Sequence, residues 1–178
     1  RLRDAVAGGA TLVVSGGTGA GKTSLLNALA SEIPPATRVI TVEDAAELAL
    51  GLPHVVRLES RPAGTEGHGA VDFRDLVRAA LRMRPDRLIV GEVRGPEAFD
   101  LMQALNTGHR GGMTTLHANS PADALRRLLM LVLSADTGVP AGVVADQLAA
   151  AVDLVVQVAR GPGATRRIVD VVTVTESM

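Results

Sequence analysis

Apolar positions follow two patterns that alternate along the chain. Short apolar runs, typical of strands buried in a sheet, are separated by longer segments in which apolar residues recur every three or four positions, as in helices. The predicted strands are 11–15, 38–42, 55–58, 87–90, 112–116, 154–159 and 168–174. The predicted helices are 23–31, 73–83, 96–107, 121–133 and 141–151. This alternation predicts an α/β protein with a mostly parallel sheet covered by helices on both faces.

Turn and cap residues sharpen these boundaries. Asp72 can cap the helix after it, Gly108 can end the helix before it, and Ser120 followed by Pro121 opens a third. The turn-forming residues 160–164 separate the last two strands, which are therefore predicted to form a C-terminal β-hairpin. Residues 60–70 hold three glycines and a proline without periodicity, which predicts a surface loop.

Composition narrows the class of protein. The 178 residues suit one α/β domain, residues 1–178, whose core is aliphatic because the chain has two Phe and neither Trp nor Tyr. The net charge of −1 and the scarcity of aromatic rings for base stacking argue against direct nucleic-acid binding. No cysteine is present, which excludes disulfides and thiolate zinc sites and fits a reducing cytoplasm.

Two features of the chain concern its place in the cell. No apolar run approaches the roughly 18 residues that span a bilayer and no signal peptide opens the chain, so membrane association is expected only through partner proteins. The first residues run almost directly into the first strand. We therefore expect a fragment whose N-terminal region is missing.

The segment after the first strand fills every fixed position of the phosphate-binding loop Gly-x-x-x-x-Gly-Lys-[Ser/Thr], between a strand and a helix as that motif requires. Its glycines permit backbone conformations closed to other residues, so that successive N–H groups can surround phosphates at a helix N-terminus. Lys22 would reach the β- and γ-phosphates and Thr23 would ligate Mg²⁺. A glycine-rich turn before an ordinary helix is the alternative. The residues predicted to bind ATP with Mg²⁺ are Gly17, Thr18, Gly19, Ala20, Gly21, Lys22, Thr23 and Ser24.

Two strands end in carboxylates, and in parallel sheets ligands gather where strands end. Glu92 follows strand 87–90 and could hold Mg²⁺ directly or through water; the alternative is a solvated carboxylate. Glu43 closes strand 38–42 and is the candidate base that orients or deprotonates the attacking water. The alternative is that Glu43 and Asp44 cap segment 45–50.

Histidine and arginine supply the remaining candidates. His117 follows strand 112–116, where it could donate to a γ-phosphate oxygen and report its loss, although strand-end histidines are often structural. Arg78 and Arg82 lie four apart on helix 73–83, where like charges repel unless an anion compensates them. That anion could be a phosphate bound by the same or a neighbouring subunit. Salt bridges to Asp72, Asp75 or Asp86 are the alternative.

Three further segments carry a resemblance to a known family. Residues 41–48, 81–94 and 107–121 resemble the Asp box, atypical Walker B and His box of the type II/type IV secretion ATPase superfamily. Within it the chain is most similar to the tight-adherence (Flp) pilus ATPases, the CpaF/TadA branch, from about residue 12 to residue 174. In the His box, Arg110 stands where many members have an acidic residue. No Cys-x-x-Cys zinc module is present, which counts against the main type II assembly branch.

The resemblance implies a RecA-like C-terminal motor domain of a hexameric ring, docked on integral membrane platform proteins at the cytoplasmic face. There ATP hydrolysis would drive pilin assembly or substrate secretion. By position, Lys22 and Thr23 serve phosphate and Mg²⁺, Glu43 is the general base, Glu92 the Walker B carboxylate and His117 the γ-phosphate sensor. Arg94 also matches the pattern of the family. Family members usually carry an N-terminal domain that supplies arginines across the subunit gap.

Two other function classes stay open from sequence alone. A non-catalytic ATP-binding scaffold would keep nucleotide binding without turnover. A RecA-like nucleic-acid motor would want a basic groove and stacking aromatic residues, which are scarce here. A GTPase is disfavoured because no Asn-Lys-x-Asp tetrapeptide occurs.

Overall fold

Every predicted strand and helix is present in the computed structural model, which describes residues 1–65 and 68–174. The strands are β1 (Leu12–Gly16), β2 (Val39–Glu43), β3 (Val55–Glu59), β4 (Arg87–Val90), β5 (Met113–Leu116), β6 (Leu154–Arg160) and β7 (Arg166–Thr173). The helices are α2 (Lys22–Ala30), α3 (Phe73–Arg82), α4 (Glu97–Asn106), α5 (Pro121–Leu133) and α6 (Ala141–Ala151). Predicted and observed boundaries agree within two residues, the usual uncertainty of element ends.

Two short elements were not predicted. Helix α1 (Leu2–Ala7) has only six residues, too few to show a repeating apolar pattern, and it buries only Val6. The 3-10 turn η1 (Pro162–Ala164) joins β6 to β7. The turn-forming residues 160–164 around η1 indicated a turn rather than a helix.

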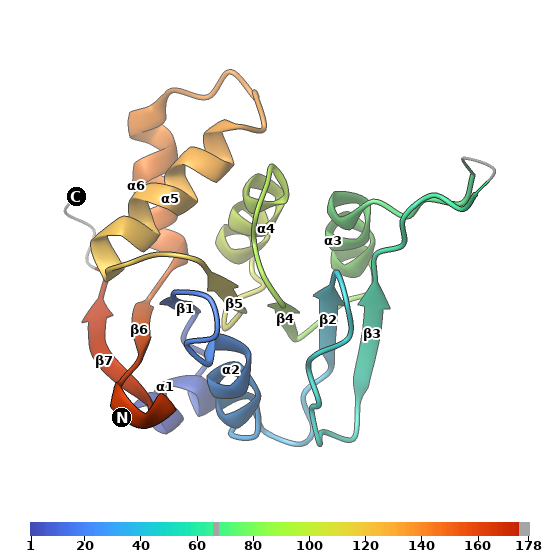
Figure 1. Cartoon of the computed structure of the whole chain (residues 1–178). Coiled ribbons are helices and arrows are strands. Elements are labelled where there is room, and N and C mark those ends of the chain that lie inside the picture. The colour runs from blue at the N-terminus through green and yellow to red at the C-terminus, as the bar shows by residue number, and fades with distance from the viewer. Residues whose placement is uncertain (66–67, 175–178) are drawn as a thin grey trace.

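The strands form one seven-stranded sheet in the order β3-β2-β4-β5-β1-β6-β7. Strands β1 to β6 are parallel, and β7 pairs with β6 in antiparallel fashion, which confirms the predicted C-terminal hairpin (Figure 1). Because the six parallel strands point the same way, their carboxyl ends lie along one edge of the sheet. That edge carries the segments predicted to hold the site.

Helices cover both faces, as predicted. Helices α1 and α2 lie on one face and α3 to α6 on the other (Figure 1). Successive residues of β1 alternate between the two layers, since Leu12 and Val14 join the core under α2 while Val13 joins the core under α4 to α6. This alternation explains why β1 reads as a continuous apolar run, because a strand buried on both faces has no polar side.

The predicted caps are confirmed. The Asp72 carboxylate accepts a hydrogen bond from the backbone N–H of Arg74 at 2.8 Å, and α3 begins at the next residue after Asp72. The Ser120 hydroxyl accepts from the Asp123 N–H at 3.1 Å, with Pro121 in the first turn of α5. Gly108 follows α4 with a φ of 107°, which other residues rarely adopt.

In the predicted loop at 60–70, Ser60 is half-buried and residues 61–65 and 68–70 are exposed, whereas residues 66 and 67 lie outside the described residues. None of the described helices is both long and apolar enough to cross a membrane.

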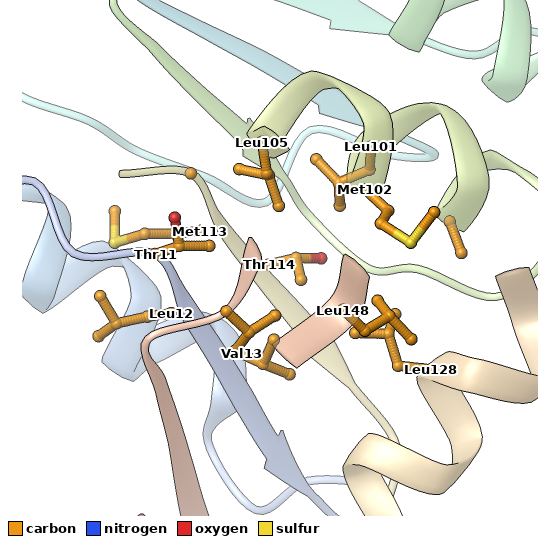
Figure 2. A pocket seen from close by; sticks show the side chains of 13 residues that line it. Thr11, Leu12, Val13, Leu101, Met102, Leu105, Met113, Thr114, Leu128 and Leu148 are labelled. Carbon is orange, nitrogen blue, oxygen red and sulfur yellow. The ribbon is translucent and has the colours of Figure 1, made fainter. Parts of the chain in front are cut away.

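A hollow of about 10 Å³ lies in the core between β1, β5 and helices α4, α5 and α6 (Figure 2). Leu101, Met102 and Leu105 of α4 face Val13 across it, and only two of the labelled side chains, Thr11 and Thr114, carry hydroxyls. A space of that size holds about one water. It is a small packing gap with no charge to hold a phosphate.

Candidate active site

The phosphate loop, Glu43, Glu92 and His117 lie at the carboxyl edge of the sheet. Glu43 ends β2, Glu92 follows β4, His117 follows β5 and the phosphate loop follows β1. These four strands are neighbours in the order β2-β4-β5-β1, so the four predicted groups stand side by side although Lys22 of the phosphate loop and His117 are 95 residues apart in the chain. The sheet topology thus brings these four predicted groups together.

Glycine shapes the phosphate loop at three positions. Gly19 and Gly21 have φ of 69° and 96°, in the left-handed region, and Gly21 is the residue before α2. A Cβ on Gly16 would lie 2.5 Å from the carbonyl oxygen of Val158 in β6, so only glycine lets the two strands approach there. Gly17, Thr18 and Gly19 are exposed and Ala20 is buried, which leaves the outer half of the loop open to a ligand.

Lys22 is turned inward across the loop. The residue is 8% exposed, and Nζ donates to the carbonyl oxygens of Gly16 and Gly17, each at 3.2 Å. Nζ also lies 3.2 Å from Nε2 of His117. Burial lowers the pKa of the Lys22 ammonium, an effect opposed by the negative charge of Glu92. The loop lysine and the predicted sensor histidine are therefore in direct contact.

Glu92 connects the histidine to Arg94. Its Oε1 lies 3.2 Å from His117 Nε2, and its Oε2 accepts from Arg94 Nη2 at 2.9 Å. Burial raises the pKa of Glu92, but the hydrogen bond from Arg94 and the charges of His117, Arg94 and Lys22 outweigh it, so the pKa falls below its ordinary value. Arg94 also lies 3.7 Å from Asp44. The Glu92 carboxylate is held charged at the centre of the site.

Glu43 is buried, with 4% of its surface exposed. Its Oε1 accepts hydrogen bonds from the backbone N–H groups of Glu47 and Leu48, both at 2.9 Å. One oxygen of Glu43 thus caps the start of segment 45–50, as the alternative interpretation predicted, although that segment forms no helix. Glu43 also lines a pocket of about 180 Å³ together with Thr23, Glu92 and Thr115. Only Oε2 is left to act on a ligand in that pocket.

Glu47 is a site residue that the sequence reasoning missed. Its carboxylate accepts a hydrogen bond from the Thr23 hydroxyl at 3.1 Å, the group predicted to ligate Mg²⁺. Asn27 of α2 holds the same loop, because its amide oxygen accepts from the Ala49 N–H at 2.9 Å. The signal in the sequence was the carboxylate four residues after Glu43, within the segment that resembles the Asp box.

Gln157 and Arg166 come from the C-terminal hairpin and were also missed. Gln157 is 5% exposed; its amide accepts a hydrogen bond from the Ser15 hydroxyl and donates to the Ala118 carbonyl at 3.2 Å. It thereby ties the strand before the phosphate loop to the residue after His117. Arg166, the first residue of β7, lies against Gly21. No local pattern marks either contact, because both join residues that are far apart in sequence.

Arg78 and Arg82 are not brought to this site. Neither lines the pockets beside the phosphate loop in the described part of the chain. Arg78 is exposed and its Nε donates to Asp100 of α4 at 2.9 Å, with Asp75 at 3.9 Å. Arg82 is exposed at the end of α3. The salt-bridge alternative therefore holds for Arg78, through Asp75 and an unforeseen partner, Asp100, whereas a phosphate bound by Arg78 or Arg82 stays a prediction.

Two further residues of the His box, His109 and Arg110, lie before β5, at the opposite edge of the sheet from His117. His109 Nδ1 lies 3.3 Å from the carbonyl oxygen of Pro85. Arg110 forms an ion pair with Asp153, at 3.4 Å. This pair gives a structural reason for a basic residue at position 110. His117 follows β5 at the carboxyl edge and His109 precedes it, so His117 is the histidine on the side of the phosphate loop.

A metal would have few protein ligands here. Within residues 1–65 and 68–174 no group of three or more His, Asp or Glu side chains could hold a metal ion. Mg²⁺ bound with a nucleotide needs no such cage, because substrate phosphates, water and one or two protein oxygens complete its shell. The Thr23 hydroxyl and the Glu92 carboxylate, which lie at one pocket, fit that requirement.

Comparison with known proteins gives consistent matches. Residues 4–175 match the family model described as type II/IV secretion system protein. A putative conjugal transfer protein of Mycobacterium tuberculosis is 48% identical over 176 residues, 99% of this chain and 49% of that protein. The type IV secretion system protein PtlH of Bordetella pertussis is 45% identical over 177 residues, 96% of this chain and 52% of that protein.

A solved structure agrees. The crystal structure of the VirB11 ATPase from the Brucella suis type IV secretion system, in complex with sulphate, superposes with a TM-score of 0.86 at 37% identity, over 97% of this chain and 50% of that one. The chain spans about half the length of the relatives it matches. The RecA-like P-loop fold is thereby established, whereas the named relatives do not single out the tight-adherence branch.

Proposed function

The chain belongs to the type II/IV secretion system protein family, and we propose that it is the Mg²⁺-dependent ATP-hydrolysing motor domain of a larger secretion or pilus-assembly ATPase. One observation carries this proposal. Lys22 of the phosphate loop, His117 and Glu92 form a continuous chain of contacts at the carboxyl edge of the sheet, with 3.2 Å between each pair of neighbours. A cation for phosphate, a sensor and a carboxylate are what phosphoryl transfer needs in one place.

Binding is assigned to the loop between β1 and α2. Its backbone N–H groups, from Gly17 to Ser24, meet the α- and β-phosphates at the positive end of the α2 dipole. Lys22 then exchanges its contacts with the Gly16 and Gly17 carbonyls for phosphate oxygens, which a short movement of a flexible side chain allows. Thr23 and Glu92 are the residues that would hold Mg²⁺. Held there, Mg²⁺ would neutralise part of the negative charge that develops on the phosphate oxygens.

Hydrolysis is assigned to Glu43. Its Oε2 accepts a proton from a water in the pocket that it shares with Glu92, while the water oxygen bonds to the γ-phosphorus and the bond from that phosphorus to the bridging oxygen breaks. ADP and phosphate leave. The two backbone hydrogen bonds to Oε1 hold the carboxylate in one orientation, which favours a base that must act in a defined geometry.

His117 is proposed to sense the γ-phosphate. It touches both Lys22 and Glu92, so a change at the phosphate reaches both groups through one ring. Gln157 fixes the following residue, Ala118, to the strand that leads into the phosphate loop. Loss of the γ-phosphate would then change the contacts at the carboxyl ends of β5 and β1 together.

The assembly that uses this hydrolysis is proposed from the relatives. We place the domain in a hexameric ring at the cytoplasmic face of the membrane, bound to integral membrane platform proteins. The relatives named for conjugal transfer and type IV secretion support export through such a platform. Pilin assembly by a tight-adherence system stays a prediction from the sequence motifs. Arg82, exposed on α3, remains available to a neighbouring subunit.

A non-catalytic ATP-binding scaffold is the second candidate. It is favoured by one observation, the use of Glu43 Oε1 to hold the backbone of Glu47 and Leu48, which gives that residue a structural role of its own. Retained binding without turnover, in a ring-forming protein, would support the scaffold.

Phosphate release from Mg·ATP, measured over a range of chain concentrations, tests the proposal. We expect turnover whose rate per chain rises with concentration, because a ring completes each site with residues from a neighbour. A constant nonzero rate would mean that one chain holds the whole site. If ATP binds without turnover, the longer protein should be assayed, and inactivity there would leave the scaffold as the better account.

A further inference from the structure

Arg166 reaches the phosphate loop from the opposite end of the chain. A Cβ placed on Gly21 would lie 2.7 Å from Arg166 Cδ, so the arginine side chain lies directly against the backbone of that glycine. Its Nη1 is 3.5 Å from the hydroxyl of Ser24, a residue 142 positions earlier. Arg166 lines one pocket of about 370 Å³ with Lys22, Glu92 and other residues of the site.

The side of the loop that Arg166 touches differs from the side that carries the carboxylates. Lys22 and Thr23 reach toward His117 and Glu47. Gly21 and Ser24 are three residues apart, on one face of the first turn of α2, and Arg166 covers that face. In loops of this motif the lysine reaches the β- and γ-phosphates, whereas the backbone around the helix start surrounds the α- and β-phosphates. Arg166 therefore faces the half of the nucleotide remote from the bond that breaks.

Within the described residues, the charge of Arg166 has no carboxylate partner. Among the described residues no carboxylate forms an ion pair with it, and the same holds for Arg160 and Arg167 beside it on the hairpin. The single contact to Ser24 leaves most of the five guanidinium N–H donors free. Such a group suits a phosphate, which guanidinium can bind through two parallel hydrogen bonds.

The hairpin holds Arg166 in place through its own turn. The Gly161 N–H donates to the Thr165 carbonyl at 2.8 Å, and the Thr165 hydroxyl donates to the Pro162 carbonyl at 3.0 Å. Through β6, the hairpin is hydrogen-bonded to β1, the strand that leads into the phosphate loop. The position of the guanidinium is thus set by the same sheet that sets the loop.

We propose that Arg166 is a nucleotide-binding residue that holds the α-phosphate of ATP and ADP alike. This inference rests on the ATP binding proposed above. Because the α-phosphate is unchanged as the γ-phosphate leaves, Arg166 stabilises substrate and transition state equally, and it contributes to KM rather than to kcat.

The test compares Arg166→Ala with Arg167→Ala, a control that removes the same charge from the next residue of β7. The dissociation constants of ADP and of a non-hydrolysable ATP analogue are measured by calorimetry, with kcat and KM for Mg·ATP. We expect Arg166→Ala to weaken both ligands by a similar factor, about 10-fold, as expected for one lost charge-assisted hydrogen bond. Arg167→Ala should stay close to the parent chain, kcat should be unchanged in both, and Arg166→Lys should recover part of the affinity.

The outcomes separate this inference from the proposed function. If the parent chain binds ADP and Arg166→Ala binds it equally well, the inference is wrong and the ATPase proposal stands. A loss confined to the ATP analogue, a fall in kcat, or an equal loss in Arg167→Ala would also overturn it, because each would place the effect at the γ-phosphate or in overall charge. If the parent chain binds no nucleotide, both proposals fail. Arg166→Lys keeps the comparison valid if Arg166→Ala does not fold.

Discussion

The two flanks of the phosphate loop offer a nucleotide different chemistry. On the flank formed by β2, β4 and β5, Glu43, Glu92 and His117 end or follow their strands, and the groups are buried or paired with one another. On the flank formed by β6 and β7, Gln157 is buried and its amide links two neighbouring strands through hydrogen bonds. Arg166 is an exposed cation without a carboxylate partner in the described residues. We infer that the first flank acts on the phosphate that leaves and the second on the part that stays bound.

Lys22 lies between the two flanks, and its loss should have the largest effect. Lys22→Ala removes the charge that meets two phosphates, so we expect the affinity for ATP to fall by roughly 100-fold or more, since each hydrogen bond to a charged group contributes about 1.5–3 kcal/mol. Calorimetric titration with the ATP analogue measures it. Arg87→Ala, which removes a charge at the opposite edge of the sheet, is the control and should bind ATP as the parent chain does. Tight binding of ATP by Lys22→Ala would refute the assignment of the loop.

Changes on the reaction flank should separate turnover from binding. Glu43→Gln keeps the size of the side chain and removes the base, so we expect phosphate release to fall by about 10²–10⁴-fold, the usual contribution of a general base, while ADP affinity changes little. Single-turnover assays of Glu43→Gln and Glu92→Gln provide the comparison. If Glu92→Gln gives the inert state with nucleotide bound and Glu43→Gln does not, the roles of the two carboxylates must be exchanged.

A change at Gln157 should lower the stability of the fold more than it lowers the rate of hydrolysis. Gln157→Leu leaves the Ser15 hydroxyl and the Ala118 carbonyl without their buried partner, which we expect to lower the free energy of unfolding by about 1–3 kcal/mol. Urea denaturation of Gln157→Leu, Ser15→Ala and the double variant measures the coupling. Additive losses would show that the two side chains do not depend on each other.

The smallest effect concerns the protonation of Glu92. Burial raises the pKa of Glu92, and the Arg94 hydrogen bond is the largest of the opposing effects, so Arg94→Ala should raise that pKa. A carboxyl whose folded pKa is lowered adds stability above its unfolded pKa and loses it as the pH falls through the folded pKa. The parent chain should therefore lose more stability on acidification than the variant does. Carboxyl-carbon NMR titration reads the shift; an unchanged Glu92 pKa would contradict the assigned role of Arg94.

Sequence predicted one flank and not the other, for a physical reason. The elements followed from apolar periodicity, and the phosphate loop, Glu43, Glu92 and His117 stand at strand ends that a linear pattern can find. Arg166 and Gln157 act through contacts 142 residues away, which depend on β6 lying beside β1 in the sheet. Strand order is a long-range property, so no local pattern could place the hairpin at the loop.

Arg78 shows the same limit of local sequence patterns, because a local pattern suggested a ligand where a residue distant in sequence supplies the partner. Its spacing from Arg82 suggested an anion, and the acids considered as partners were those nearby in sequence. The partner that binds it most closely is Asp100, which α4 places against α3, at 2.9 Å. A charge pattern on one helix cannot show what a neighbouring helix will supply.

The central claim is the division of work between the flanks, and one paired measurement tests it most directly. ADP affinity and single-turnover hydrolysis would be determined together for Glu43→Gln and Arg166→Ala. We expect Glu43→Gln to keep ADP affinity and lose hydrolysis, and Arg166→Ala to lose affinity and keep the rate of hydrolysis at saturating ATP. If both variants lose the same property, the two flanks act as one unit and the division is wrong.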